Sequence, residues 1–163
     1  MKKIFLLACL LLAATTSLKA QSLYETVYNS AISKVNNPQS AQEQIEVSQF
    51  EVTALNYIFN EVKKRGLEKS AYFYDSQAVN LKSFVDDFLY YVQKARAIST
   101  DKRKEVIKIY RDASLKNKLF NDTNLDRVLC YVNDTKTLTP FSLDTDWEKA
   151  YDEATAKVKA VLK

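Results

Sequence analysis

This chain of 163 residues contains one glycine, Gly66, and two prolines, Pro38 and Pro140. Glycine and proline interrupt helices most strongly, because glycine loses the most backbone entropy and proline lacks an amide hydrogen and clashes with the preceding turn. So few interruptions favour long helices joined by short connections. No stretch alternates convincingly between apolar and polar residues, so we expect an all-α protein with essentially no sheet.

Apolar residues recur at helical spacing in six segments. The strongest pattern lies in the third segment, where six apolar side chains share one face at 100° per residue: Leu81, Phe84, Val85, Phe88, Val92 and Ala95. We expect helices over residues 22–35, 40–65, 72–97, 101–115, 123–132 and 146–162. Six helices with short connections predict a single domain over residues 21–163, an antiparallel bundle or array.

Several helix ends carry capping signals. A serine or threonine followed three residues later by a glutamate forms a capping box, in which each side chain satisfies a free backbone amide of the first turn. Gly66 follows the second predicted helix, at the position where a positive φ angle is tolerated. The predicted boxes are Ser22–Glu25, Ser40–Glu43 and Thr145–Glu148.

Residues 1–20 have the organisation of a secretory signal peptide. Lys2 and Lys3 precede an uncharged apolar run over residues 4–14, and we expect cleavage between Ala20 and Gln21. The run is too short for a membrane anchor, which needs roughly 20 apolar residues, so no transmembrane anchor is expected after cleavage. A lipobox ending at Cys9 is the alternative, but the apolar stretch before it is short, so lipid anchoring at Cys9 is not expected.

The charge balance argues against a nucleic-acid partner. The chain has 24 basic and 20 acidic residues, and removing Lys2, Lys3 and Lys19 with the leader leaves 21 against 20. Nucleic-acid binding relies on a clustered excess of basic residues. The basic run over residues 102–104 is flanked by Asp101 and Glu105 and is explained as a solvated helix face.

The chain contains no histidine. The histidine-dependent nucleophilic triads and histidine-ligated zinc or haem sites are therefore excluded. A single glycine also leaves no glycine-rich phosphate loop. Cys130 is the one cysteine after the leader, so no internal disulfide forms; we interpret it as a buried apolar residue, with a reactive thiol as the alternative. We expect no cofactor.

Two acidic segments resemble metal-binding patterns. Asp122, Asn124 and Asp126 match the first ligand positions of a calcium loop, but Arg127 stands where that loop needs glycine. The acids in residues 144–148 are better explained as the start of a helix, where they meet the positive end of its dipole. We therefore predict no metal site and name no catalytic residue, although a pair of carboxylates can hydrolyse a glycosidic bond without histidine.

Aromatic residues remain as the most distinctive feature, with all 10 tyrosines, seven phenylalanines and one tryptophan following the leader. Tyr72, Phe73 and Tyr74 are consecutive and cannot all face inward on one helix. Tyr90 projects about 180° away from Leu81 on the helical wheel. We predict these four residues as a possible contact surface, since tyrosine suits interfaces and sugar-stacking sites.

The Lys2-Lys3 start, the Ala20–Gln21 junction and the small helical body resemble exported proteins of Bacteroidota-type bacteria. The segment Leu-Thr-Pro-Phe-Ser-Leu-Asp-Thr-Asp-Trp over residues 138–147 is similar to stretches in uncharacterised proteins of that kind. The resemblance implies an exported helical protein and no particular activity.

We therefore expect a non-enzymatic protein of the periplasm or the extracellular space that binds a protein partner through a tyrosine-bearing face. One alternative is a carrier of a small apolar ligand or sugar, which an aromatic-lined groove larger than about 300 Å³ would indicate. The other is a carboxylate hydrolase, which needs two acids facing each other across a cleft.

Overall fold

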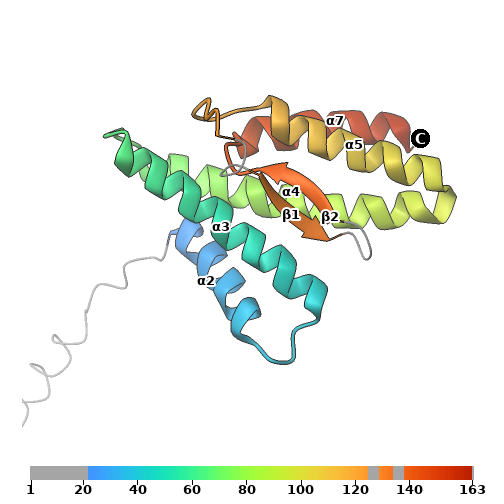
Figure 1. Cartoon of the computed structure of the whole chain (residues 1–163), viewed down its shortest axis with the longest axis horizontal. Helices are drawn as coiled ribbons and strands as arrows, with labels where there is room; N and C mark the ends of the chain where they lie inside the picture. The colour runs from blue at the N-terminus through green and yellow to red at the C-terminus, as the bar shows by residue number, and fades with distance from the viewer. Residues whose placement is uncertain (1–21, 125–128, 134–137, 163) are drawn as a thin grey trace, which may run out of the picture.

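The structure, a computed structural model, describes residues 22–124, 129–133 and 138–162. Within these ranges it contains five helices and one two-stranded antiparallel hairpin (Figure 1). The expected, mostly helical class is confirmed. In chain order the elements are α2 (Leu23–Asn36), α3 (Gln42–Lys64), α4 (Ala71–Ile98), α5 (Thr100–Lys116), β1 (Leu129–Asn133), β2 (Leu138–Ser142) and α7 (Trp147–Val161).

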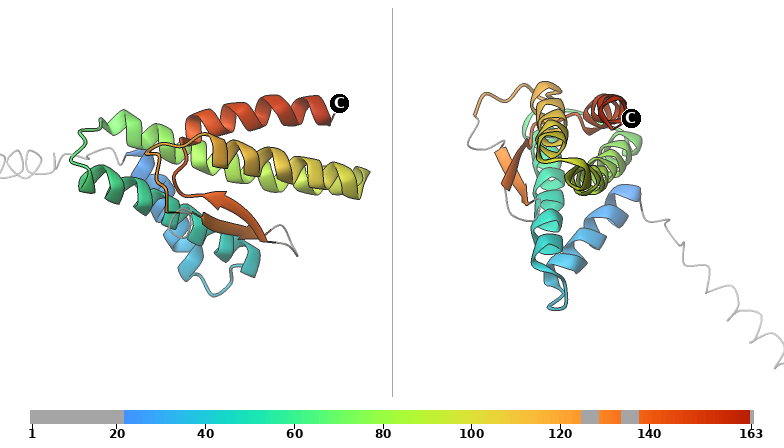
Figure 2. Two further views of the ribbon diagram at one scale, coloured as in Figure 1. Left: turned by 45° about the horizontal axis from the view of Figure 1, so that its top comes forward. Right: turned by 90° about the vertical axis from the view of Figure 1, so that its right-hand side faces the viewer.

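Helix α4 is the central element, because it contacts each of the other four helices in the described part of the chain. Helices α2 and α3 form a helical hairpin against one side of α4, while α5 and α7 pack along the other (Figures 1 and 2). Ser99 alone joins α4 to α5, and its side chain caps α5 by accepting from the Lys102 amide at 3.1 Å. Helices α4 and α5 run antiparallel, whereas α7 runs in the same direction as α4 (Figure 1).

The predicted apolar face of α4 is buried along its whole length: Leu81, Phe84, Val85, Phe88, Val92 and Ala95. The Phe84 ring lies in the middle of an aromatic core, with its centroid 5.0 Å from that of Tyr110 and 5.3 Å from those of Phe141 and Trp147. Most of these ring pairs meet edge to face, the arrangement that the charge distribution of aromatic rings favours. The core therefore joins α4, α5, β2 and α7.

The hairpin corrects two predictions. The predicted helix over residues 123–132 is wrong for its last part, since residues 129–133 form β1, and the expectation of essentially no sheet is wrong too. Strand β1 pairs with β2 in a register that places Cys130 opposite Phe141. Val132 and Phe141 are fully buried, so packing against the core fixes the hairpin. The segment Leu-Cys-Tyr-Val-Asn over residues 129–133 does not alternate between apolar and polar residues, so the strand could not be recognised from its periodicity.

The first predicted capping box is present. Ser22 accepts a hydrogen bond from the Glu25 amide at 3.1 Å, and the Glu25 carboxylate accepts one from the Ser22 amide at 3.4 Å. Gly66 has a φ of +61°, as its position after α3 predicts. Both features depend only on residues close in sequence, which explains why they could be predicted.

The other two predicted boxes, at Ser40 and Thr145, are wrong by one residue. Helix α3 is capped at Ala41, whose amide donates to the Gln44 side chain at 3.4 Å. Helix α7 is capped by Asp146, and Thr145 is instead fully buried with its hydroxyl bonded inside the core. Contacts with distant residues decide which of two adjacent polar side chains becomes the cap.

Candidate functional site

A groove with a volume of about 230 Å³ lies where α2 and α4 begin and where α3 approaches its end. In Figure 1 this region is on the side of the molecule where the described chain starts. Three aromatic rings and two carboxylates contribute to its walls. The lining residues are Ser22, Tyr24, Glu25, Phe59, Ala71, Tyr74 and Asp75. We call this the aromatic groove.

Hydrogen bonds to α3 and α4 hold the first turn of α2 in place. The Asp75 carboxylate accepts from the Tyr24 amide at 2.8 Å, which satisfies one of the free amides at the start of α2. The Tyr24 hydroxyl donates to the Leu55 carbonyl at 3.3 Å and so ties the same residue to α3. Burial, followed by the nearby Tyr28 and Tyr74, raises the pKa of Tyr24 to about 12, so this hydroxyl stays protonated.

The rings around the groove form a contiguous cluster. The Tyr74 centroid lies 5.7 Å from that of Tyr24, 6.2 Å from that of Phe59 and 5.3 Å from that of Phe73. The ammonium of Lys69 lies over the Phe73 ring, 4.8 Å from its centroid, within range of a cation–π interaction. Phe59 is 49% exposed and forms the most open ring of the groove.

The structure brings three of the four predicted contact residues to this region. Tyr74 lines the groove, Phe73 packs against Tyr74, and Tyr72 projects outward with 76% of its surface exposed. Tyr90 is also exposed and contacts Tyr91 with a centroid distance of 5.0 Å. Tyr90 is 18 residues from Tyr72, which is five helical turns or about 27 Å along α4, so it does not belong to the groove.

Sequence reasoning missed the contributions of α2 and α3. Leu23 and Phe59 are large apolar residues within two of the predicted helical segments, yet both are exposed. Ile58 is fully buried and its neighbour Phe59 is 49% exposed. Adjacent helical residues such as Ala54 and Leu55 can both be buried, so no signal in the sequence marked Phe59 as exposed. The position of Tyr24 beside Tyr74 likewise depends on how α2 packs against α4.

A second groove, of about 390 Å³, lies between the end of α2, the start of α3 and the middle of α4. Its lining includes Lys34, Glu43 and Asp86, but no aromatic ring. Of these two grooves, the aromatic one is smaller than the roughly 300 Å³ that the carrier hypothesis requires, and the larger one has no rings. Neither groove favours the carrier.

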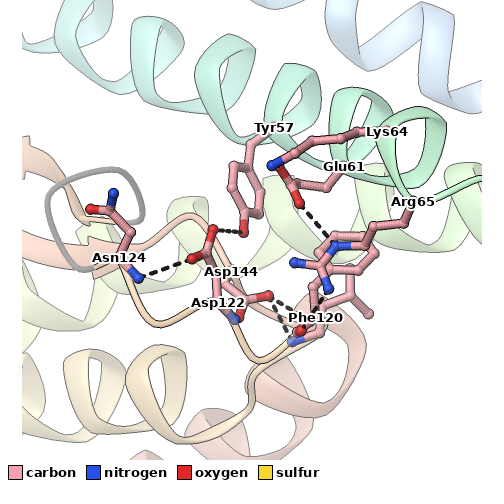
Figure 3. Close-up of polar contacts among 9 residues, drawn as sticks. Tyr57, Glu61, Lys64, Arg65, Phe120, Asp122, Asn124 and Asp144 are labelled. Carbon is pink, nitrogen blue, oxygen red and sulfur yellow. Dashed lines mark hydrogen bonds and ion pairs between the residues drawn. The ribbon is translucent and has the colours of Figure 1, made fainter.

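In the described loop after α5, hydrogen bonds to carboxylates hold the backbone in its conformation. Asp144 is fully buried and accepts from the backbone amides of Leu119, Phe120 and Asp122 at 3.2, 2.6 and 2.7 Å (Figure 3). The Tyr57 hydroxyl donates to Asp122 at 3.1 Å. The Asp144 carboxylate thus provides the hydrogen-bond acceptors for three backbone amides of this loop. The hydrogen bond from Tyr57 links the loop to α3.

Glu61 and Arg65 complete this anchor. Arg65 donates to Glu61 at 2.9 Å and to the Phe120 carbonyl at 3.1 Å, with its guanidinium 5.2 Å from the Phe120 ring centroid (Figure 3). The hydrogen bond from Arg65 holds the pKa of Glu61 below its usual value. The amide of Asn124 and then Tyr57 lower the pKa of Asp122 in the same way. A lowered pKa keeps these two carboxylates charged, as hydrogen-bond acceptors should be. A general acid needs a raised pKa instead.

The acidic patterns recognised in the sequence do not converge. Asp122 accepts from the Asn124 amide at 2.9 Å, in a tight turn, and Asp126 lies outside the described residues. Asp146 caps α7, while Glu148 accepts from the Ser76 hydroxyl at 2.7 Å on α4. Within the described ranges no group of three potential metal-ligating side chains is found.

Several predictions concern residues beyond those described. The cleavage position between Ala20 and Gln21 and the alternative lipid attachment at Cys9 lie outside the described ranges, and so does the side chain of Cys130. None of the described helices is long and apolar enough to cross a membrane.

Comparisons with protein-family models, with curated proteins and with solved structures find no match to this chain. The functional conclusions below therefore depend on the residues and geometry of the chain itself.

Proposed function

We propose that this protein is an exported, non-enzymatic accessory protein that binds a protein partner through the aromatic groove and the exposed side chains next to it. The observation that carries the proposal is the set of exposed large apolar residues there. Leu23 is adjacent to the groove residues Ser22 and Tyr24, Phe59 lines the groove itself, and Tyr72 follows its lining residue Ala71. We call Leu23, Phe59 and Tyr72, together with the groove, the aromatic patch.

The physical basis is the free energy of removing these side chains from water. Burying one large apolar side chain contributes about 1.5–3 kcal/mol, so three such residues supply a substantial part of a moderate affinity. Tyrosine and phenylalanine are enriched in the centres of protein interfaces, and a few large anchors usually dominate the binding energy. Tyr24 and Tyr74 are fixed by packing and hydrogen bonds, so little conformational entropy is lost at this surface on binding.

Export supports the same proposal from the sequence. A chain that begins with a leader of the signal-peptide type meets its partners in the cell envelope or outside the cell. The absence of histidine removes the commonest general base, and the carboxylates around the loop after α5 act as hydrogen-bond acceptors. A binding role fits these features better than the hydrolase alternative, because Glu25 and Asp75, the two carboxylates of the aromatic groove, each accept a hydrogen bond from a backbone amide at the start of α2.

The first test compares two double variants in partner capture from cell-envelope extracts. Phe59→Ser with Tyr72→Ser removes the exposed anchors of the aromatic patch, and we expect captured partner to fall at least about tenfold, since two anchors are worth more than 1.4 kcal/mol. The matched control, Tyr90→Ser with Ile98→Ser, removes two similarly exposed residues from the second half of α4.

We expect the control variant to retain capture. Thermal unfolding of both variants checks that the fold is intact, because exposed substitutions of this kind change stability by only about 0.5 kcal/mol. Equal capture by both variants and the unmodified protein would contradict the proposal.

A further inference from the structure

The aromatic groove carries negative charge. Glu25 and Asp75 are carboxylates, and none of its lining residues is a lysine or an arginine. The groove also includes the first turns of α2 and α4, and each helix N-terminus contributes about half a positive charge. Two carboxylates against two such ends leave a net charge of about minus one. The groove is therefore electrostatically suited to a cation.

Both carboxylates are held in place with one oxygen still available. Glu25 uses Oε2 to accept from the Ser22 amide, and Asp75 uses Oδ1 to accept from the Tyr24 amide. The second oxygen of each makes no hydrogen bond or ion pair with the described residues. A ligand can pair with these oxygens without breaking the hydrogen bonds that position the first turn of α2.

The aromatic walls favour a cation with a flat face. The rings of Tyr24 and Tyr74 meet at 74°, and those of Phe59 and Tyr74 at 47°, so the rings that line the groove lie in different planes. Ring faces are electron-rich and attract ammonium and guanidinium groups. The neighbouring Phe73 ring already holds the ammonium of Lys69 within the same cluster.

We infer that the aromatic groove binds a basic side chain of the protein partner, arginine in preference to lysine. The inference rests on the proposed function and adds the chemistry that the partner presents. A guanidinium is planar, stacks on aromatic faces and pairs with carboxylates through two donors, whereas an ammonium satisfies only the charge. A volume of about 230 Å³ suits one side chain better than a whole small-molecule ligand.

The test uses a peptide pair that differs only in charge. Acetyl-Gly-Arg-Gly-amide and its citrulline counterpart have nearly the same shape, but citrulline is neutral. Each is titrated into the exported protein while the backbone NMR signals of Tyr24, Tyr74 and Asp75 are followed. We expect the arginine peptide to shift these signals with a Kd at least about tenfold lower than that of the citrulline peptide. We also expect its binding to weaken as salt is added, because salt screens the charges.

A double variant tests the two carboxylates directly. Glu25→Gln with Asp75→Asn removes both charges and keeps an oxygen acceptor at each position, so the capping box and the bond to the Tyr24 amide are retained. We expect this variant to bind the arginine peptide about tenfold more weakly. The matched control, Asp101→Asn with Glu105→Gln at the start of α5, removes two exposed charges elsewhere and should change the Kd less than about twofold.

Three results would overturn the inference. They are equal binding of the arginine and citrulline peptides, tighter binding of a methyl glycoside than of the arginine peptide, and no shift of the groove signals with up to about 10 mM arginine peptide. Because the peptide comparison uses the unmodified protein, it remains decisive if the double variant is unstable. If loss of Phe59 and Tyr72 abolishes partner capture while the charge-neutral variant still captures, the inference fails and the proposed function stands. If both variants capture normally, both fail.

Discussion

Glu51 is a carboxylate placed where an apolar residue would be expected. Only 3% of its surface is exposed, and it lies on α3 near Lys34 from α2 and near Lys82 and Asp86 from α4. Burial raises its pKa, and the two lysines oppose that shift only in part. Neither lysine is within ion-pair distance of Glu51 in the described structure, so the charge is poorly compensated and destabilises the folded state at neutral pH.

Replacing Glu51 should therefore stabilise the protein. We expect Glu51→Met to raise the free energy of unfolding by about 1 kcal/mol at pH 7, with Glu51→Gln giving less because its amide also needs partners. The pKa of Glu51 is higher in the folded state than in the unfolded state. The wild type therefore gains stability as the pH falls through the folded-state pKa. The advantage of the variant should shrink and disappear near the unfolded value of 4.5. Urea unfolding at several pH values measures this, and a constant difference would contradict the explanation.

At the scale of elements, the Phe141 ring packs the hairpin against the helices. The Phe141 centroid lies 5.7 Å from that of Phe50 on α3 and 5.3 and 5.1 Å from those of Phe84 and Phe88 on α4. An isolated two-stranded hairpin is only marginally stable in water. The hairpin therefore depends on the helices for its structure, while its buried ring fills space between them.

Removal of that ring should cost far more than a change on the same strand outside the core. We expect Phe141→Ala to lower the free energy of unfolding by about 3–5 kcal/mol, because a large buried ring leaves a cavity. Pro140→Ala, at the adjacent partly buried position, should change it by less than about 1 kcal/mol. Chemical unfolding of both variants provides the comparison. Similar losses for the two would show that strand propensity, and not packing, maintains the hairpin.

For the whole molecule, the pH dependence of stability combines acids that act in opposite directions. Glu153 on α7 accepts from Lys157 at 2.6 Å, and from Asn117 at 2.9 Å and Lys116 at 3.2 Å near the end of α5. These bonds, that from Lys157 first, lower the pKa of Glu153 to about 2. Its stabilising contribution is complete above the ordinary value of 4.5 and declines as the pH falls towards 2, opposite to the effect of Glu51.

Glu153→Gln should destabilise the protein at pH 7 by about 1 kcal/mol, a modest value because Lys116 and Lys157 are exposed and salt screens them. The difference from the wild type should vanish as the pH approaches 2. Thermal unfolding across this pH range measures it, with Asp101→Asn as a fully exposed control. A difference that persists at acidic pH would contradict the assignment of this effect to the Glu153 charge.

The sequence was sufficient where neighbouring residues set the outcome. The helical segments 22–35, 72–97 and 101–115 were predicted close to their observed limits, because their apolar faces repeat over many turns. The strand at residues 129–133 was not, since only its packing against Phe141 and the core distinguishes it from a short helix. Of the aromatic groove, Tyr74 could be predicted, whereas Tyr24 and Phe59 could not be placed beside it.

The sequence by itself determined that the described chain is mostly helical, since one glycine and two prolines leave long uninterrupted segments. It also determined that histidine chemistry is absent. The tertiary structure alone decided that Asp144 is buried beneath the loop after α5, that Glu51 lies among α2, α3 and α4, and that three rings and two carboxylates meet in one groove. The hydrogen bond of Asp144 to the Asp122 amide joins residues 22 positions apart, and that of Asp75 to the Tyr24 amide joins residues 51 positions apart. Packing between helices fixes such contacts where local periodicity cannot.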